Sequence, residues 1–390
     1  MQNFMYHIPT KVLFGRGEVN KLGDEIKAYG SKVLLVYGGG SIKKIGLYDK
    51  VVNILDDNKI SFWELCGVDP NPRVTSVEEG IKICRKNDID VILPVGGGSV
   101  IDCAKMIAAG VKTDSDDTWG IVTGKVDLKE ILPVITVLTL AATGSEMDTS
   151  AVISNMDTFE KISRSNSGMR PKVAIMDPEY TFTVPKRQTA AGTADIISHV
   201  LEVYFNNNKG AYLQSRFAEA VLKTCIEYGH RAYNTPDDYE ARANLMWASS
   251  WAINGLLTKG APVSWSCHAM EHELSAFYDI THGVGLAILT PRWMRHILAK
   301  DSTATGRFVK FARNVMGLDG EDEAKLALAG IDALEEYFKS TGIPMTLTEL
   351  GIDEEHFEVM ADHANEGGYL KDAYVALTNE DIIQIYKACL

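Results

Sequence analysis

The residues best suited to chemistry in this chain are an aspartate and three histidines in its second half. Asp195 and His199 stand four residues apart in an apolar segment, so a helix there places both side chains on one face, one turn apart. His268 and His282 follow in a second unusual stretch. One carboxylate with several imidazoles suits Fe(II) or Zn(II) and suits calcium poorly. A lone histidine on an apolar face is more often a core residue, but the combination with Asp195 favours a site for one divalent metal.

The same region contains a competing motif. His268, Glu271 and His272 match the H-x-x-E-H pattern of a group of zinc proteases, in which the glutamate is the general base. A five-residue pattern arises easily by chance. A protease also leaves Asp195, His199 and the glycine-rich turns unexplained, so we set this reading aside.

Two identical glycine-rich turns indicate a dinucleotide site. Gly96, Gly97, Gly98 and Ser99 lie between an apolar run at 91–95 and a predicted helix, the position where ligands bind in open α/β sheets. Glycines let the backbone approach a pyrophosphate, and a helix N-terminus offers unpaired N–H groups. Alone, the turn is equally consistent with a tight, well-capped connection. The repeat of the motif after the first strand makes a dinucleotide the better explanation.

That second turn also bears on the cofactor. Gly38, Gly39, Gly40 and Ser41 are followed by two lysines, with no acidic residue until Asp49. NAD sites usually place an acidic side chain on the adenosine ribose, where it would repel a 2′-phosphate. The turn therefore favours NADP(H) over NAD(H), with a solvated loop carrying stray lysines as the alternative.

The elements that must position these residues change in character along the chain. Apolar, β-branched runs at 32–37, 60–65, 91–95 and 134–139 alternate with helical segments, which is typical of βαβ units and a parallel sheet. Residues 4–14 are expected to form an edge strand or hairpin, and 112–130 a polar loop. Beyond about Pro185 only helical periodicity is found. We therefore predict an α/β dinucleotide-binding domain (1–185) and an all-helical metal- and substrate-binding domain (186–390).

Composition narrows the functional class. The 390 residues are 46% hydrophobic and 23% charged, with a net charge of −13. These values are typical of a globular enzyme, and the acidic balance argues against nucleic acid and anionic membranes as partners. The six cysteines are scattered and form no C-x-x-C pair, which predicts reduced thiols. The sequence shows no signal peptide and no membrane-spanning run, so we expect a cytoplasmic protein.

These motifs together resemble the iron-containing alcohol dehydrogenase family. The resemblance is carried by Asp177…Pro185…Gly192-Thr193-Ala194-Asp195…Glu202, by Trp265 to His272 with His282-Gly283, by Gly96 to Asp102, and by Ala142 to Glu146. It covers essentially the whole chain. Within the family the chain looks most like clostridial butanol dehydrogenases and NADPH-dependent broad-range aldehyde reductases. The fold expected is a Rossmann-like, dehydroquinate synthase-like domain followed by helices.

The resemblance also implies roles for individual residues. It makes Asp195, His199, His268 and His282 the metal ligands and gives His272 a catalytic part in proton relay. The cofactor contacts that it implies, together with the two glycine-rich turns, are Asn71, Asp102, Thr139, Leu140, Thr143 and Lys161. The segment after Lys161 departs from the family pattern, which weakens that one assignment.

The expected activity is hydride transfer between a nicotinamide and a primary alcohol or aldehyde, with the metal acting as a Lewis acid on the substrate oxygen. A polyol or glycerol dehydrogenase and a dehydroquinate synthase-like enzyme are the alternatives within the fold. Few basic residues flank the ligand stretches, which disfavours a phosphorylated substrate. Relatives commonly dimerise through an N-terminal edge strand, so a homodimer is expected.

Overall fold

A computed structural model describes residues 1–208, 210–261 and 263–390. It contains eight strands and fifteen α-helices within these residues. The strands are β1 (Lys11–Phe14), β2 (Lys32–Val36), β3 (Ser61–Leu65), β4 (Val91–Gly96), β5 (Ile135–Leu138), β6 (Ser150–Asn155), β7 (Glu160–Ser165) and β8 (Val173–Met176). The helices of the first half are α1 (Leu22–Lys27), α2 (Ser41–Lys44), α3 (Leu47–Asp57), α4 (Val74–Asn87), α5 (Gly98–Gly110) and α6 (Thr118–Thr123). Those of the second half are α7 (Lys186–Tyr204), α8 (Tyr212–Asn234), α9 (Tyr239–Ile253), α10 (Ser266–Tyr278), α11 (His282–Lys300), α12 (Thr305–Asn314), α13 (Glu323–Ser340), α14 (Phe357–Ala364) and α15 (Asn379–Ala388).

Chain contacts divide these elements into two compact units. One unit comprises residues 7–184 and 236–250, and the other residues 1–6, 185–235 and 251–390. We call them the sheet unit and the helical unit. The expected α/β architecture followed by helices is confirmed. The predicted domain limits, 1–185 and 186–390, stay a prediction.

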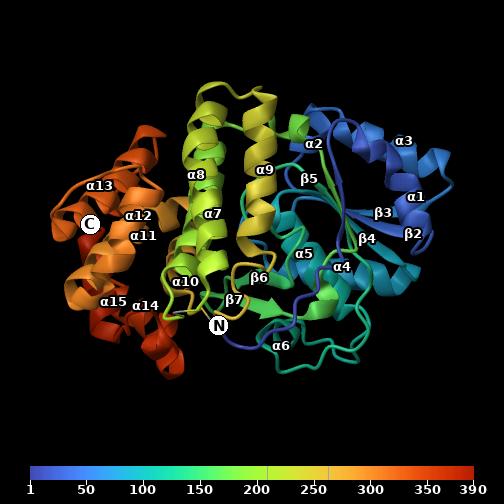
Figure 1. The fold of residues 1–390 in the computed structure, drawn as a ribbon. Helices are drawn as coiled ribbons and strands as arrows, with labels where there is room; N and C mark the ends of the chain where they lie inside the picture. The colour runs from blue at the N-terminus through green and yellow to red at the C-terminus, as the bar shows by residue number, and fades with distance from the viewer. Residues whose placement is uncertain (209, 262) are drawn as a thin grey trace. The chain divides into compact units, whose positions relative to one another are not determined.

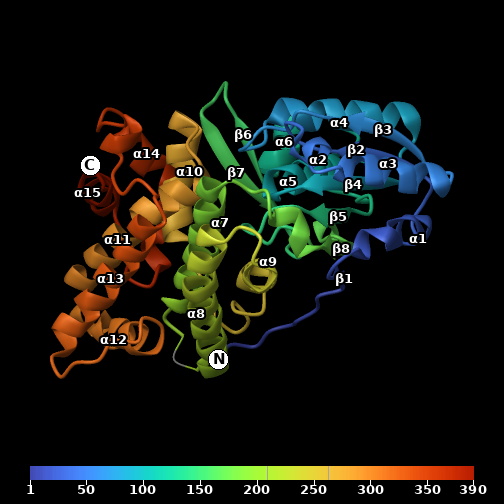
Figure 2. The same cartoon turned by 90° about the horizontal axis from the view of Figure 1, so that it is seen from above.

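The sheet unit is built on six parallel strands in the order β1-β8-β5-β4-β2-β3. Successive side chains of a strand point to opposite faces, and β2 shows this directly. Val33 and Leu35 join the buried cluster that includes residues of α1 and α3, whereas Leu34 and Val36 join the cluster that includes residues of α4 and α5. Helices therefore cover both faces of the sheet, as Figure 2 shows for α4 and α1. This burial on both faces explains the near-continuous apolar runs of the strands.

Three parts of the sheet unit differ from expectation. Residues 150–165 form an antiparallel hairpin, β6 with β7, and residues 173–176 form β8 between β1 and β5; neither was expected as a strand. The segment 112–130, expected to be a loop, contains α6, which Asp117 caps by accepting from the Gly120 N–H. Of the two alternatives for residues 4–14, the edge strand is confirmed: it is β1, which covers residues 11–14 and pairs in parallel with β8.

The helical unit packs its long helices in pairs. α7 lies against α8 and α11, α10 lies against α11 and α14, and α12 lies against α13; Figure 1 shows α7 and α8 side by side. No helix among the described residues is both long and apolar enough to cross a membrane. All six cysteines are free, as expected for reduced thiols.

Candidate active site

One face of α7 carries the first two predicted metal ligands. Asp195 and His199 are four residues apart in this helix and both are buried. The Oδ1 atom of Asp195 lies 3.3 Å from Nδ1 of His199. The next turn of the same face carries Glu202, which is also buried. The predicted one-turn spacing therefore places two potential ligands next to each other.

The other two predicted ligands come from the first turns of α10 and α11. His268 Nε2 lies 3.9 Å, and His282 Nε2 3.7 Å, from Oδ1 of Asp195. One ligand atom from each of these three residues lies within 4.8 Å of the others. His199 joins them through Asp195 and through a stacked contact with His268, at 4.4 Å between ring centroids. Three helices of one unit thus bring all four predicted ligands together.

Several polar atoms of this cluster are buried without a hydrogen bond. They are Oδ1 of Asp195, Nδ1 of His199 and Nε2 of His268. A buried polar atom that lacks a partner costs about 1–3 kcal/mol, so three in one place call for an explanation. A divalent cation bound by one carboxylate and imidazoles would satisfy them, and this donor set suits Fe(II) or Zn(II). The residues therefore fit the predicted metal.

The electrostatics of the cluster agree with cation binding. Burial would raise the pKa of Asp195, but the surrounding imidazoles hold it below its usual value, so the carboxylate is charged. Burial lowers the pKa of His199 to about 4, which leaves a neutral imidazole at pH 7. Burial opposes charge on His268 too, but Glu202 and Asp195 together raise its pKa to about 9. A cation binding there would displace that proton.

His272, the predicted catalytic residue, lies beside the cluster and is half-buried. Its ring centroid is 5.7 Å from that of His282 and 6.4 Å from that of His268. The neighbouring Glu271 is fully buried and accepts hydrogen bonds from Ser275 and His282. Such a glutamate does not have the access to water that the protease reading requires.

In the sheet unit, the predicted phosphate-binding turn connects β4 to α5. Gly96 ends the strand and Gly98 begins the helix. A Cβ atom on Gly98 would lie 2.3 Å from Oγ1 of Thr143, and one on Gly97 would lie 3.2 Å from Cβ of Leu140. The glycines therefore allow the helix N-terminus to pack against the 140–143 segment. This juxtaposition of Gly97, Gly98, Leu140 and Thr143 brings four predicted cofactor contacts together.

Asp102, another predicted cofactor contact, is turned into the sheet unit. Its Oδ1 accepts from the Ser145 hydroxyl at 2.5 Å and its Oδ2 from the Val152 N–H at 3.0 Å. Ser145 in turn accepts from Lys105, a fully buried lysine that also donates to Asp148 and to the Ser150 carbonyl. This polar network joins α5 to the turn after β5. No pattern in the sequence pointed to it, because its partners are about forty residues apart.

The second glycine-rich turn, Gly38 to Ser41, follows β2 and leads into α2. Gly40 has φ 99°, and Cβ atoms on Gly39 and Gly40 would meet nothing within 4 Å. The ammonium of Lys43 lies over the rings of Tyr37 and Tyr48, at 5.0 and 4.5 Å. Both phenol hydroxyls donate to Glu64. An acidic group that is distant in sequence therefore neighbours the lysine next to this turn.

The remaining predicted cofactor contacts lie elsewhere in the sheet unit. Asn71 is buried with φ 51° between two prolines, after β3. Thr139 follows β5, and its N–H donates to the Gly96 carbonyl. Lys161 is buried on β7, opposite Ser154 of β6.

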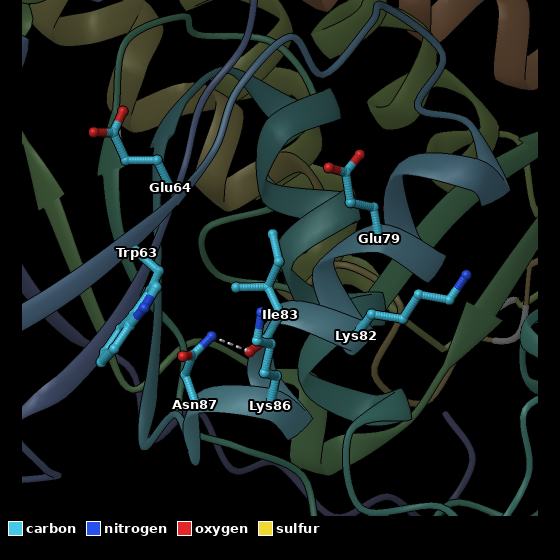
Figure 3. A pocket seen from close by; sticks show the side chains of 7 residues that line it. All are labelled: Trp63, Glu64, Glu79, Lys82, Ile83, Lys86 and Asn87. Carbon is cyan, nitrogen blue, oxygen red and sulfur yellow. Dashed lines mark hydrogen bonds between the residues drawn. The ribbon is translucent and has the colours of Figure 1, made fainter.

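One further pocket is an open hollow on the surface of the sheet unit. It is lined by Trp63 and Glu64 of β3 and by Glu79, Lys82, Ile83, Lys86 and Asn87 of α4 (Figure 3). Lys82 pairs with Glu78, and the Asn87 amide donates to the Ile83 carbonyl. No predicted site residue lines it, so its mixed charges are explained as a solvated helix surface.

Comparison with known proteins identifies the family. The model described as iron-containing alcohol dehydrogenase matches residues 9–178, and that described as the C-terminal part of the Fe-containing alcohol dehydrogenase family matches residues 189–390. The chain therefore belongs to the iron-containing alcohol dehydrogenase family.

Individual relatives match the chain over 94% or more of its length. It is 55% identical to NADH-dependent butanol dehydrogenase A of Clostridium acetobutylicum, with 99% of each chain covered. It is 37% identical to the NADPH-dependent aldehyde reductase YqhD of Escherichia coli, with 94% of each covered. The crystal structure of NADH-dependent butanol dehydrogenase A from Thermotoga maritima matches with a TM-score of 0.93 and 42% identity, covering 100% of this chain and 99% of that one.

Proposed function

We propose that this alcohol dehydrogenase interconverts primary alcohols and aldehydes of the butanol range by hydride transfer to and from a nicotinamide dinucleotide. The observation that carries the proposal is the buried group of atoms of Asp195, His199 and His268 that have no hydrogen bond. Similarity to butanol dehydrogenases and to an aldehyde reductase over the whole chain supports the substrate class.

In this proposal Asp195, His199, His268 and His282 hold one divalent cation. When bound, the cation supplies a Lewis acid for the substrate oxygen, and the nicotinamide supplies or accepts the hydride. The carboxylate of Asp195 would offset only part of the charge of the cation to which it binds, so the cation would keep charge with which to stabilise the developing oxyanion. We assign His272 the exchange of the alcohol proton at its imidazole, because the ring lies beside His282.

Metal removal tests the proposal. We expect anaerobically purified protein loaded with Fe(II) or Zn(II) to oxidise reduced nicotinamide in the presence of butyraldehyde, and chelator-treated protein to be inactive until the metal is restored. Equal activity without metal would contradict it. Faster turnover of glycerol than of butanol would favour the polyol alternative.

For the cofactor we propose NAD(H), against the sequence expectation of NADP(H). The Lys43 charge lies over two rings whose hydroxyls donate to Glu64, so it is partly balanced and less available to a 2′-phosphate. Four relatives at 46–56% identity are named NADH-dependent butanol dehydrogenases, two of them as probable ones. We expect a higher kcat/KM with NADH than with NADPH, and the reverse order would restore the sequence expectation.

We also propose a homodimer. Strand β1 is at one edge of the sheet, and such an edge is a template for pairing with another chain. Phe14 at its end is exposed and contacts the exposed Trp247 edge-on. Light scattering should give twice the mass of the chain; a monomer at micromolar concentration would refute the pairing.

A further inference from the structure

Two buried glutamates contact the imidazoles that converge on Asp195. The Nδ1 atom of His268 is hydrogen-bonded to Oε2 of Glu202, and Nδ1 of His282 to Oε2 of Glu271. In both rings Nε2 is the nitrogen nearer to Asp195 Oδ1, at 3.9 and 3.7 Å. A carboxylate accepts hydrogen bonds but does not donate them, so each contact places the ring proton on Nδ1. In the neutral ring, the lone pair of Nε2 is then directed to the cluster.

Glu202 also fixes the start of the helix that carries His268. Its Oε1 accepts from the Cys267 N–H at 2.6 Å and its Oε2 from the His268 N–H at 3.1 Å. The first N–H groups of a helix have no partner within the helix, and the N-cap residue of α10, Trp265, makes no side-chain cap. Glu202 on α7 therefore supplies the missing acceptor. One carboxylate holds both the backbone and the ring of His268.

Glu271 is held as firmly. Its side chain is fully buried, and its Oε1 accepts from the Ser275 hydroxyl at 2.5 Å. A Cβ atom on Gly285, in the first turn of α11, would lie 2.8 Å from Cγ of Glu271. The absence of a side chain at Gly285 is thus what leaves room for the glutamate next to His282.

We propose that Glu202 and Glu271 are positioning residues of the metal centre, which set the tautomer and orientation of His268 and His282. The inference rests on the proposed metal site. A histidine ligand whose other nitrogen donates to a carboxylate is held in the coordinating tautomer and is a stronger donor, and loss of such a partner typically weakens metal binding about 10–100-fold. Neither glutamate need touch the cation or the substrate.

The alternative role for Glu271 is that of a metal ligand. Ligand atoms of Glu271, His272 and His282 also lie within 4.8 Å of one another. If Glu271 were itself a ligand of a second cation, the chain would bind two metal ions, and replacement of Glu271 would remove one of them. The positioning role predicts one ion per chain before and after replacement.

The test compares Glu202→Gln and Glu271→Gln with Glu273→Gln as control. Glu273 is a buried glutamate of the same helix α10, but its carboxylate bonds to His363 instead of a ligand histidine. Zn(II) affinity is measured by competition with a chromophoric chelator, stoichiometry by elemental analysis, and ligand geometry by the visible absorption of the Co(II)-loaded protein. NADH binding and the unfolding midpoint of metal-free protein report folding independently.

We expect both test variants to bind Zn(II) about 10–100-fold more weakly than wild type, with a shifted Co(II) spectrum and unchanged NADH binding. Glu273→Gln should match wild type in all three. Wild-type affinity and spectrum in a folded Glu271→Gln variant would overturn the inference for Glu271, and the same result in Glu202→Gln would overturn it for Glu202. If Glu202→Gln fails to fold, its role is that of a helix cap and Glu271→Gln alone decides the inference. A wild-type protein that binds no metal would instead refute the proposed function.

Discussion

At the scale of single residues, the site depends on Asp195, because it is the acidic member of the cluster and lies next to three imidazoles. Its Oδ1 atom lies within 4 Å of a ring nitrogen of each of His199, His268 and His282. This atom is buried and has no hydrogen bond, which is unfavourable unless a cation is bound to it.

We expect Asp195→Asn to lose bound metal and alcohol dehydrogenase activity while keeping NADH binding, because the predicted dinucleotide contacts belong to the sheet unit. Elemental analysis and fluorescence titration with NADH are the measurements. Asp301→Asn, which replaces a carboxylate that only caps a short turn, is the control and should retain both metal and activity. Full metal content in Asp195→Asn would contradict the ligand assignment.

A second residue-scale prediction concerns pH and Asp102. Burial raises the pKa of this carboxyl from 3.8 to about 6, against the opposing effect of Lys105. The folded chain therefore binds more protons than the unfolded chain between about pH 4 and about pH 6, so the contribution of Asp102 to the free energy of unfolding falls as pH rises through this range, by about 3 kcal/mol at most.

Urea unfolding of metal-free wild type and Asp102→Asn across this range is the measurement. The stability of wild type relative to the variant should decrease up to about pH 6 and then stay constant. Asp114, an exposed carboxyl whose pKa Lys129 holds below its usual value of 3.8, has an effect of opposite sign that is complete by about pH 4, so an Asp114→Asn comparison should show no fall across this range. A flat difference for Asp102→Asn would show that the carboxyl has the same pKa in both states.

At the scale of elements, the cluster requires α7 and α11 to approach very closely. A Cβ atom on Gly283 would lie 2.0 Å from the carbonyl oxygen of Ala191, which is backbone and cannot move aside. Gly283 follows His282, and Ala191 precedes Asp195 by one turn. The contact thus determines how far the fourth predicted ligand lies from the others.

We expect Gly283→Ala to force the two helices apart, with a stability loss of about 1–3 kcal/mol and at least a tenfold loss of metal affinity. Gly306→Ala is the matched control, because Gly306 is an exposed helical glycine of α12 with nothing within 4 Å of its Cβ position. It should be neutral or stabilising by up to about 1 kcal/mol. Unchanged metal affinity in Gly283→Ala would refute the dependence on close approach.

The buried lysine of α5 gives the corresponding prediction in the sheet unit. Lys105→Met would leave Asp148 buried without its cation, and breaking a buried pair in this way costs about 3–5 kcal/mol. Since Lys105 and Asp102 join α5 to the turn that contains Thr143, NADH affinity should fall as well. Lys82→Met removes an exposed ion pair of α4 and should cost at most about 1 kcal/mol. Equal unfolding midpoints for the two variants would contradict this view of the network.

The sequence predicted the residues of the site more completely than the strands and helices around them. Asp195 and His199 share a helix face, so their spacing alone predicts their proximity, and the same spacing rule would have found Glu202. Strand β8 was missed because its four apolar residues follow a polar segment. The hairpin β6–β7 was missed because Ser, Asn, Lys and Arg interrupt its pattern. The network of Lys105 depends on long-range contacts, for which a single sequence gives no signal.

At the scale of the whole molecule, the order of the chain and the grouping of its contacts differ. Residues 236–250, most of them in α9, group with the sheet unit, and Met246 packs with Ile101 and Leu138. Helical periodicity indicates that a helix has a buried face but not which core receives it. A split of the sequence into an α/β half and a helical half therefore could not place this segment.

Cysteine reactivity tests the folded molecule as a whole. Cys66 is exposed, while Cys84, Cys103, Cys225, Cys267 and Cys389 are buried. Burial raises the pKa of all five buried thiols, that of Cys84 and Cys389 to about 12, and the thiol form reacts far more slowly than the thiolate. We expect a chromogenic disulfide reagent to modify one thiol rapidly in the native protein and six in denaturant. Cys66→Ser should abolish the rapid phase, and a rapidly reacting thiol that remains in that variant would show that one of the buried segments opens in the native state.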